Sequence, residues 1–264
     1  MSSQKPTIVL SHGLAHAPAC YEPLATALRA AGFEFIAPRH PSLGAGVINA
    51  TMDREVAALR SAMQPAIDAG KEIILLAHSY GGLVAAPAAQ GYTLSERRAV
   101  EGSKSGGIKA VVYMTAFAAS QKGAYPLDAV FKCGKELPAG MVRLEVDGKL
   151  TDNVVVTGTP EEKAAFQFVF YNDLEAAQVD TIVPLLESMA LGAALEPTTV
   201  VPADLKCTQA YILCEKDNAM PPAVAEGYVS ATPGMKVFRL DSGHAPFVSR
   251  VGEVVKILED LARE

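Results

Sequence analysis

Tryptophan is absent from this sequence of 264 residues, and aromatic residues make up only 6% of it. Cysteine is also scarce. The four cysteines have neither the C-x-x-C spacing of zinc sites nor the density of a disulfide scaffold, so we expect buried free thiols. They are Cys20, Cys133, Cys207 and Cys214. Histidines and acidic residues are likewise scattered without the spacing of metal ligands, so we expect no metal and no other cofactor.

Long hydrophobic runs are missing as well. The densest apolar segment, 110–119, is much shorter than the roughly 18 residues that cross a bilayer, and Thr115 interrupts it, so it predicts a buried strand. Residues 1–6 are polar and lead directly into an apolar segment, unlike a secretory signal with its hydrophobic centre. We therefore expect a cytoplasmic protein without a membrane span.

Basic residues are not in excess. Lys and Arg total 23 against 29 Asp and Glu, and the resulting net charge of −6 argues against nucleic acid as the main partner. Apolar residues form 50% and charged residues 20% of the chain, a composition that allows a large buried core. At about 100 to 200 residues per domain, the length indicates one large domain or one domain that carries an insertion.

Short apolar runs alternate with amphipathic patterns along most of the chain. Their continuous apolar character predicts strands covered on both faces, as in a parallel sheet. The runs lie at 7–10, 34–37, 72–77, 108–114, 209–214 and 236–240. Segments 21–31, 53–69 and 251–262 repeat apolar residues at three-to-four spacing and predict helices. The alternation predicts an α/β fold with a mostly parallel open sheet flanked by helices.

One connection is far too long for this pattern. About ninety residues separate the run at 108–114 from the run at 209–214, whereas βα and αβ connections usually have about 2 to 6 residues. We therefore expect an inserted cap subdomain over 119–202, with residues 1–118 and 203–264 forming the core.

The insertion has its own pattern. Residues 142–146 lead into Asp147-Gly148, which suits a two-residue turn with positive φ and predicts a β-hairpin. Apolar residues at helical spacing follow between Phe166 and Met189 and predict helices.

The most informative segment covers 73–85, where an apolar strand meets a helix of small residues. The junction at 77–81 reads Ala-His-Ser-Tyr-Gly, a small-x-Ser-x-Gly pattern with no room for a loop. Such a junction predicts a sharp turn that strains the serine and exposes its hydroxyl above the carboxyl end of the sheet. Ala77 stands where glycine is usual and adds only a methyl group. We predict that Ser79 is a nucleophile.

A serine hydroxyl needs a neighbouring base. In sheet enzymes with this turn, the acid and then the histidine follow the serine along the chain, and His244 is the only histidine after Ser79. It lies directly after the run at 236–240 and before the segment 251–262. We therefore predict that His244 is the general base.

The third member is a carboxylate that fixes the imidazole tautomer. Asp217 ranks first, because it lies just past the run at 209–214 and before a helix that Pro221-Pro222 opens. Glu215 ranks second. Asp241 ranks third, because it is too close to His244 in sequence for an easy approach to the ring.

Acyl transfer creates an oxyanion that backbone amides stabilise. We expect two donors, the amide of Tyr80 and the amide of Leu14, which the flexible turn at Gly13 brings to the site. His16, Gly13 and Phe117 are candidates for the substrate pocket, with plain loop packing as the alternative for His16. The other histidines are predicted to be structural: His12 in a loop, His40 in a turn, and His78 as the spacer of the serine turn.

With these residues in place, the sequence resembles the α/β-hydrolase superfamily over nearly its whole length. Within it, four segments are similar to the branch that contains plant methylesterases and hydroxynitrile lyases. They are His12-Gly13-Leu14-Ala15-His16, Ala77-His78-Ser79-Tyr80-Gly81-Gly82, Cys214-Glu215-Lys216-Asp217, and Gly243-His244 with Pro246-Phe247.

The resemblance implies an α/β-hydrolase fold with a small, mainly helical cap inserted after the sixth strand. It gives the nucleophile, acid and base positions to Ser79, Asp217 and His244, and the oxyanion positions to the amides of Leu14 and Tyr80. Two positions depart from the pattern of the branch. Tyr21 takes the place of a large aromatic residue that often follows the His-Gly segment, and Ala77 takes the place of a glycine.

Other functions on the same fold are alternatives. Hydroxynitrile lyases of this branch have a threonine after the first histidine and a lysine beside the catalytic histidine, where this chain has Gly13 and Ala245. Without that cation a departing cyanide lacks its electrostatic partner, so hydrolysis is favoured. Receptors of this fold bind a small molecule without fast turnover, and an intact triad argues against that role. Epoxide hydrolases and haloalkane dehalogenases use aspartate in place of Ser79.

The sequence thus predicts a serine hydrolase that cleaves a carboxylic ester, thioester or lactone through an acyl-enzyme. The expected partner is a small, moderately hydrophobic ester, because the insertion supplies apolar residues to roof the site. These lie around Phe117, Phe131, 166–170 and 185–191. The sequence is compatible with a homodimer.

Overall fold

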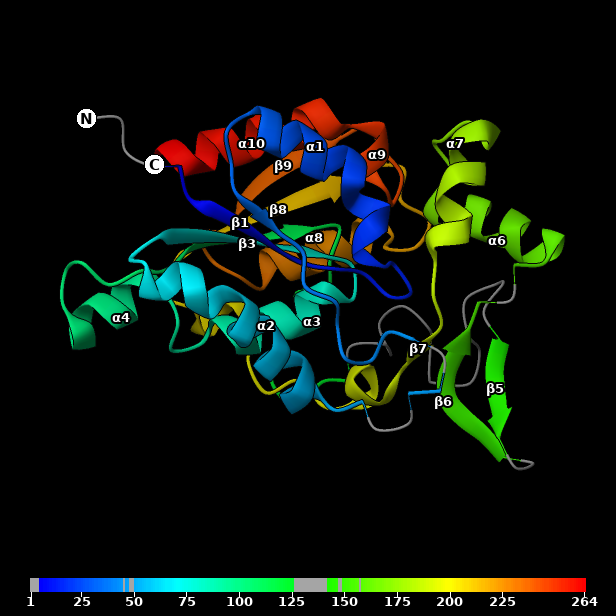
Figure 1. The fold of residues 1–264 in the computed structure, drawn as a ribbon, viewed down its shortest axis with the longest axis horizontal. Helices are drawn as coiled ribbons and strands as arrows, with labels where there is room; N and C mark the ends of the chain where they lie inside the picture. Colours follow the sequence, from blue (N-terminus) through cyan, green and yellow to red (C-terminus); the bar gives the residue numbers. More distant parts are fainter. Residues whose placement is uncertain (1–4, 45, 48–49, 126–141, 147–148, 157) are drawn as a thin grey trace.

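A single parallel sheet forms the centre of the molecule (Figure 1). The computed structural model describes residues 5–44, 46–47, 50–125, 142–146, 149–156 and 158–264. Within them, six parallel strands follow the order β2-β1-β3-β4-β8-β9. The strands are β1 (Thr7–Ser11), β2 (Phe35–Ile36), β3 (Glu72–His78), β4 (Gly107–Met114), β8 (Thr208–Cys214) and β9 (Lys236–Leu240). The predicted open parallel sheet is confirmed, and only β2 is shorter than its apolar run.

Helices cover both faces of the sheet. On one face lie α1 (Glu22–Ala30), α9 (Pro246–Ser249) and α10 (Val251–Arg263), and on the other lie α2 (Met52–Asp68), α3 (Gly81–Ala89) and α8 (Pro222–Ser230). Helix α4 (Leu94–Glu101) precedes β4. Ile8 and Leu10 pack in the core on the α1 side, whereas Val9 packs on the α2 side. Because successive strand residues point to opposite faces, this double burial explains why the strands are continuously apolar.

The long connection between β4 and β8 forms an insertion of mixed structure. It contains α6 (Pro160–Phe170) and α7 (Ala176–Ile182), and an antiparallel sheet of β5 (Val142–Val146), β6 (Lys149–Val155) and β7 (Met189–Ala190). Short 3-10 turns lie at Pro18–Tyr21, Val183–Leu185, Gly192–Leu195 and Pro202–Asp204. The β5–β6 hairpin confirms the predicted pairing, although its turn at 147–148 lies outside the described residues.

The strand that precedes the insertion has a different number from the one that the resemblance implied. The insertion follows β4, the fourth strand in chain order rather than the sixth, because the described sheet has six strands and two of them come after the insertion. Its three-stranded sheet also adds β structure to a cap that was expected to be mainly helical. The division into a core of 1–118 with 203–264 and a cap of 119–202 stays a prediction.

The strand order reverses between β1 and β3. From β1 the chain adds β2 on one side, and then crosses to add β3 and the remaining strands on the other side. In open α/β sheets, the carboxyl ends of the strands at such a reversal leave a crevice where ligands bind. Ser11 at the end of β1 pairs with Ala77 near the end of β3. The segments that follow these two strands therefore meet at one edge of the sheet.

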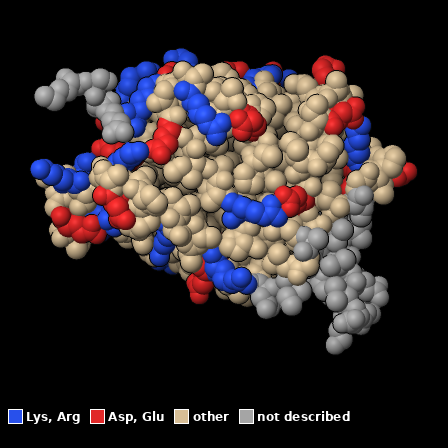
Figure 2. All heavy atoms as spheres, in the orientation of Figure 1, with Lys and Arg blue, Asp and Glu red and all other residues tan. Residues whose placement is uncertain are grey.

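The described helices include none with the length and apolar character that crossing a bilayer requires. The expected free thiols are found at three positions: Cys20 and Cys214 are buried, and Cys207 is partly buried. Cys133 lies outside the described residues. On the face shown in Figure 2, Lys and Arg side chains are interspersed with Asp and Glu.

Candidate active site

Ser79 occupies the sharp turn between β3 and α3. Its φ is +49°, in the left-handed region that residues other than glycine rarely adopt. The turn is tight because two glycines follow it. A Cβ atom on Gly81 would overlap the carbonyl oxygen of Ser11, and one on Gly82 would overlap that of Phe117. The predicted strained turn is therefore present, and small residues are required where strand and helix approach each other.

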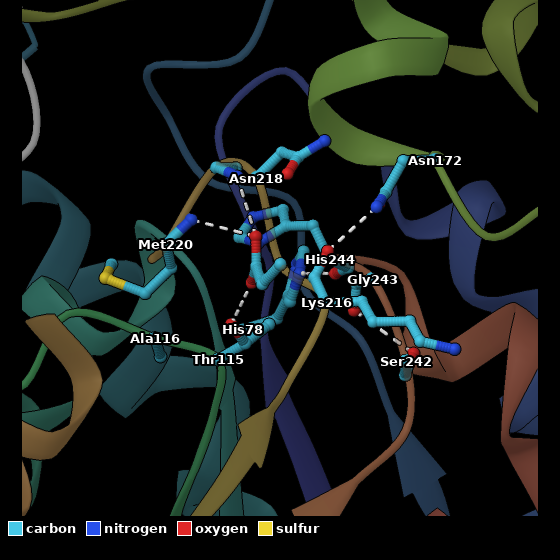
Figure 3. A network of polar contacts seen from close by, with 12 residues as sticks. His78, Thr115, Ala116, Asn172, Lys216, Asn218, Met220, Ser242, Gly243 and His244 are labelled. Atoms are coloured by element: carbon cyan, nitrogen blue, oxygen red, sulfur yellow. Dashed lines mark hydrogen bonds and ion pairs between the residues drawn. The ribbon is translucent and has the colours of Figure 1, made fainter. Parts of the chain in front are cut away.

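Asp217 contacts His244 in the loops beyond the carboxyl ends of β8 and β9. Figure 3 shows His244 within this network of polar contacts. Nδ1 of His244 donates a hydrogen bond of 2.7 Å to Oδ2 of Asp217. The backbone amides of Ala219 and Met220 donate to Oδ1 at 2.7 and 2.8 Å, and the hydroxyl of Thr115 donates to Oδ2. Both side chains are buried. Because the proton of the neutral imidazole is thus held on Nδ1, Nε2 presents a lone pair.

The other two acid candidates lie elsewhere. Glu215 pairs with Arg239 at 3.7 Å, and Asp241 pairs with Lys216 at 2.7 Å; all four side chains are largely exposed. Of the three ranked carboxylates, Asp217 is therefore the one that contacts His244.

Thr115 is a member of this network that sequence reasoning missed. It directly follows β4, has a φ of +41°, and donates its backbone amide to the carbonyl of Ile212 on the neighbouring strand β8. In the sequence, Thr115 stands out only as a polar interruption of an apolar run. The signal that was available is a hydroxyl placed at the carboxyl end of a central strand, beside the strand that leads into the loop of Asp217.

Nε2 of His244 is buried and has no hydrogen-bond partner among the described residues. Ser79 is 9% exposed and follows His78, whose ring centroid lies 4.8 Å from that of His244. The structure therefore brings the serine turn and the histidine loop together, but the Ser79 hydroxyl is not hydrogen-bonded to His244. Catalytic hydrogen bonds are often loose in free enzymes and tighten when the substrate binds.

The amides of Leu14 and Tyr80, the predicted oxyanion donors, make no hydrogen bond to another described residue. Leu14 follows β1, and Tyr80 follows Ser79. The two amides thus come from the two segments that meet where the strand order reverses.

A chain of hydrogen bonds connects these segments. The amide of Gly13 donates to the hydroxyl of Tyr21 at 2.8 Å, and that hydroxyl donates to Nδ1 of His78 at 2.7 Å. Nε2 of His78 donates to the carbonyl of His244 at 2.9 Å. Burial holds the pKa of His78 well below its ordinary value, so the ring is neutral as this pattern requires. The predicted spacer role of His78 is confirmed, and Tyr21 gives this chain a hydroxyl at the centre of the network.

His16 is buried between the core and the insertion. Its Nδ1 donates to the carbonyl of Leu14 at 2.7 Å, and its Nε2 accepts from the hydroxyl of Tyr171 at 2.9 Å. Burial lowers its pKa to about 4, so the ring is neutral. Its ring centroid lies 5.7 Å from that of Phe170.

The remaining pocket candidates lie close to the serine turn. The amide of Phe117 donates to the carbonyl of Ser79 at 3.1 Å. A Cβ on Gly13 would lie 2.6 Å from Nδ1 of His78 and 3.3 Å from the Cβ of Ser79. Contact of Gly13, His16 or Phe117 with a substrate stays a prediction.

Two other histidines lie behind the site. His12 is a buried loop residue as predicted, and its Nε2 accepts from the amide of His40 at 2.9 Å. The interpretation of His40 as a plain turn residue is incomplete, because its ring is buried and lies 2.7 Å from a carboxylate oxygen of Glu55. Sequence spacing does not reveal this pair, since its partners belong to a loop and to a helix.

Residues 168–173, at the end of α6 and just after it, form hydrogen bonds with the loops that carry Asp217 and His244. We call residues 168–173 the clamp segment. Nδ2 of Asn172 donates to the carbonyl of Lys216 at 2.8 Å, and Nδ2 of Asn218 donates to the carbonyl of Phe168 at 2.8 Å. Oγ of Ser242 donates to Oδ2 of Asp173 at 3.1 Å. The insertion therefore contacts both loops directly.

Comparison with known proteins places this chain in a family. A model of the alpha/beta hydrolase family matches residues 8–257. The chain is 26% identical over 275 residues to the alpha/beta hydrolase nvfD of Aspergillus novofumigatus, and the match covers 98% of each chain.

Solved structures agree on the fold. Polyneuridine aldehyde esterase matches with a TM-score of 0.75 and 18% identity, over 98% of this chain and 100% of that one. A methylesterase from Arabidopsis matches with a TM-score of 0.71 and 20% identity, over 97% and 98% of the two chains. Since the family model extends from β1 into α10, the protein belongs to the alpha/beta hydrolase family.

Proposed function

We propose that the protein hydrolyses a carboxylic ester, lactone or thioester of a small, moderately hydrophobic molecule, with Ser79 as nucleophile, His244 as base and Asp217 as acid. The observation that carries the proposal is the Asp217–His244 hydrogen bond, which leaves Nε2 of His244 without a hydrogen-bond partner among the described residues, beside the strained turn of Ser79. The two relatives named as esterases support ester chemistry as the class of reaction.

The residues have distinct tasks in the proposed reaction. Oγ of Ser79 attacks the carbonyl carbon while Nε2 of His244 takes its proton, and Asp217 stabilises the imidazolium that forms. The amides of Leu14 and Tyr80 stabilise the oxyanion, each worth roughly 2.7 to 4 kcal/mol in enzymes of this type. His244 then protonates the leaving alcohol, and a water molecule that His244 deprotonates releases the acid from Ser79.

The lack of room around Gly13 favours hydrolysis over the lyase alternative. A threonine side chain at this position would begin with a Cβ only 2.6 Å from His78, so the lyase hydroxyl has no space here. Ala245, at the position of the lyase lysine, is buried and carries no charge to receive cyanide.

Apolar residues of the insertion support a moderately hydrophobic substrate. The ring centroid of Phe170 lies 5.5 Å from that of His244, and Phe166 packs behind it. Phe168 points to the opposite side of α6 and is 69% exposed, so it does not belong to the expected roof. Phe131 lies outside the described residues.

Labelling with a fluorophosphonate tests the proposal. We expect mass spectrometry to find one adduct, on Ser79, with no labelling of Ser79→Ala and much slower labelling of His244→Ala. A folded protein that stays unmodified, or an adduct only on another residue, would contradict the proposal. A panel of activated esters with a cyanohydrin as control then separates hydrolase from lyase, and the absence of turnover on every substrate would favour a receptor.

A further inference from the structure

A second serine, histidine and carboxylate meet behind the turn of Ser79. Ser11 ends β1, His40 lies in the loop after β2, and Glu55 lies in the first turn of α2. Oγ of Ser11 is 3.1 Å from Nε2 of His40, and Nδ1 of His40 is 2.7 Å from Oε2 of Glu55. None of the three is more than 2% exposed, so no substrate reaches them. The hydroxyl, imidazole and carboxylate thus follow one another as in the proposed catalytic residues Ser79, His244 and Asp217, but without access to solvent.

The contacts determine where the protons lie. The hydroxyl of Ser11 donates its single hydrogen to the carbonyl of Gly81 at 2.9 Å, so towards His40 it acts as an acceptor and Nε2 carries a hydrogen. Nδ1 faces Glu55 at an ion-pair distance, although the contact is not aligned as a hydrogen bond. A nitrogen and a carboxylate oxygen 2.7 Å apart need a hydrogen between them, which either Nδ1 or the Glu55 carboxyl carries. With this hydrogen on Nδ1, His40 is an imidazolium paired with the Glu55 carboxylate.

The surroundings suit a buried ion pair. The amide of Ser42 donates to Oε1 of Glu55 at 2.9 Å, which adds a hydrogen bond to the carboxylate. The neighbouring His12 ring, 4.2 Å from that of His40, has its pKa well below its ordinary value because of burial and then of His40, so it adds no second cation. Arg39 pairs with Glu187 instead. Buried charges are costly unless they are paired and hydrogen-bonded. Here the two groups lie at ion-pair distance, Nε2 of His40 contacts Ser11, and Oε1 of Glu55 accepts from Ser42.

The pair bears on the oxyanion donors through Ser11. Ser11 lies three residues before Leu14, and Gly81 directly follows Tyr80. The Ser11–Gly81 hydrogen bond therefore ties together the two segments that carry the proposed donors, at a contact too close for a Cβ on Gly81. The Tyr80 ring also packs against His40, with centroids 5.7 Å apart.

We propose that Ser11, His40 and Glu55 form a buried positioning site, in which a His40–Glu55 ion pair locks the Ser11 hydroxyl onto Gly81 and so fixes the spacing of the Leu14 and Tyr80 amides. The three are positioning residues, since they do not touch the reacting atoms. The catalytic consequence rests on the proposed function, whereas the ion pair itself does not.

Nuclear magnetic resonance of protein labelled with ¹⁵N in histidine tests the ion pair without any substrate. We expect one imidazole to show two N–H signals at neutral pH, to vanish from the spectrum of His40→Gln, and to keep one N–H signal in Glu55→Gln. A wild-type His40 with a single N–H signal would overturn the ion pair.

Kinetics on an activated ester test the positioning role. In Ser11→Ala and Glu55→Gln we expect kcat to fall about tenfold with KM within about twofold, because oxyanion donors act mainly in the transition state. Glu226→Gln, which removes a carboxylate from the surface ion pair with Arg239, is the matched control and should keep wild-type kcat. Folded Ser11→Ala or Glu55→Gln protein with unchanged kcat would overturn the positioning role.

If Glu55→Gln does not fold, the kinetics of Ser11→Ala decide whether the positioning role holds. If the wild-type protein hydrolyses no ester, the proposed function fails while the resonance experiment still decides the ion pair.

Discussion

At the scale of single residues, the carboxylate of Asp217 is held by more donors than a triad requires. Besides His244, it accepts from two backbone amides and from the hydroxyl of Thr115. The amides belong to its own loop, but Thr115 belongs to the end of β4. This hydroxyl therefore links the orientation of the acid to the central sheet.

Replacing Thr115 tests that link. A hydrogen bond to a charged group is worth about 1.5 to 3 kcal/mol, and about 1.4 kcal/mol corresponds to a tenfold change in rate. We expect Thr115→Val to lower kcat by about tenfold or more, with a smaller effect on KM, in steady-state assays of ester hydrolysis. Thr115→Ser keeps the hydroxyl and should retain most of the activity. Equal kcat values for Thr115→Val and Thr115→Ser would show that the hydroxyl is dispensable.

His244 gives a prediction about the pH dependence of the reaction. The ring must be neutral for Nε2 to accept the proton of Ser79, so kcat/KM should fall as the pH is lowered. Measuring kcat/KM between about pH 5 and 8 checks this. A flat profile over that range would contradict a histidine base.

How far the sequence reveals single residues depends on whether their roles leave a local pattern. Ser79 lies in a five-residue pattern, and chain order then selects His244 and ranks Asp217 first. Thr115 and Glu55 leave no such pattern. An acidic residue in the first turn of α2 is what the helix dipole favours in any helix, so nothing in the sequence distinguishes Glu55 from a solvated side chain.

At the scale of secondary-structure elements, the clamp segment of the insertion contacts the loops that carry Asp217 and His244. Gly243 allows its close approach. A Cβ on Gly243 would overlap Oδ1 of Asn172 and would lie 2.7 Å from Oδ1 of Asp173. The lack of a side chain at Gly243 is therefore needed for packing, because its backbone φ is not in the left-handed region.

Substitution at Gly243 should disturb the neighbouring His244 through this contact. We expect Gly243→Ala to lower kcat by about tenfold, since displacement of a catalytic group by about 1 Å is costly. Adding Asn172→Ala removes one of the two clashes and should recover part of the loss, which double-mutant kinetics would detect. Additive losses in the double variant would contradict a steric origin.

Elements were predictable where burial repeats regularly. Each of the six apolar runs is a strand, because both faces of the sheet are covered. Helix α4 was not predicted, although its capping box of Thr93 and Glu96 is a sequence signal that was available. Strand β7 has only two residues, and its pairing with β6 depends on tertiary contacts, so no local pattern indicates it.

At the scale of the whole molecule, buried neutral histidines link stability to pH. Burial holds the pKa of His16 at about 4 and the pKa values of His12 and His78 well below the ordinary value of 6.5. In the unfolded chain these rings take up protons near pH 6.5, whereas in the folded chain they do so only at lower pH. The stabilisation from keeping them neutral is therefore complete above about pH 6.5 and is lost as the pH falls.

Urea unfolding at a series of pH values checks this. For His16 alone, we expect the free energy of unfolding to drop by on the order of 3 kcal/mol between pH 6.5 and pH 4. The variant His16→Gln, which can still donate to Leu14 and accept from Tyr171 but does not titrate, should show a shallower drop. Identical pH dependences for the two proteins would contradict the assignment to His16.

The overall architecture can be predicted from the sequence more completely than the packing of the insertion against the rest of the molecule. Alternating strands and helices predict the layers, and the length of one connection predicts an insertion. Which residues of that insertion reach the loops at 215–218 and 242–244 depends on how it packs, and no periodicity encodes this. The polar contacts of Asn172, Asp173 and Tyr171 became evident only in three dimensions.

The clamp segment has a consequence for attempts to exchange substrate preference between related enzymes. A chimera could transplant the insertion as an independent module. The contacts of Asn172 and Asp173, however, cross the boundary between the insertion and the rest of the chain. The insertion and the loops that carry Asp217 and His244 are therefore not structurally separable. A graft would work only if it carried residues 168–173 together with matching loops at 215–218 and 242–244.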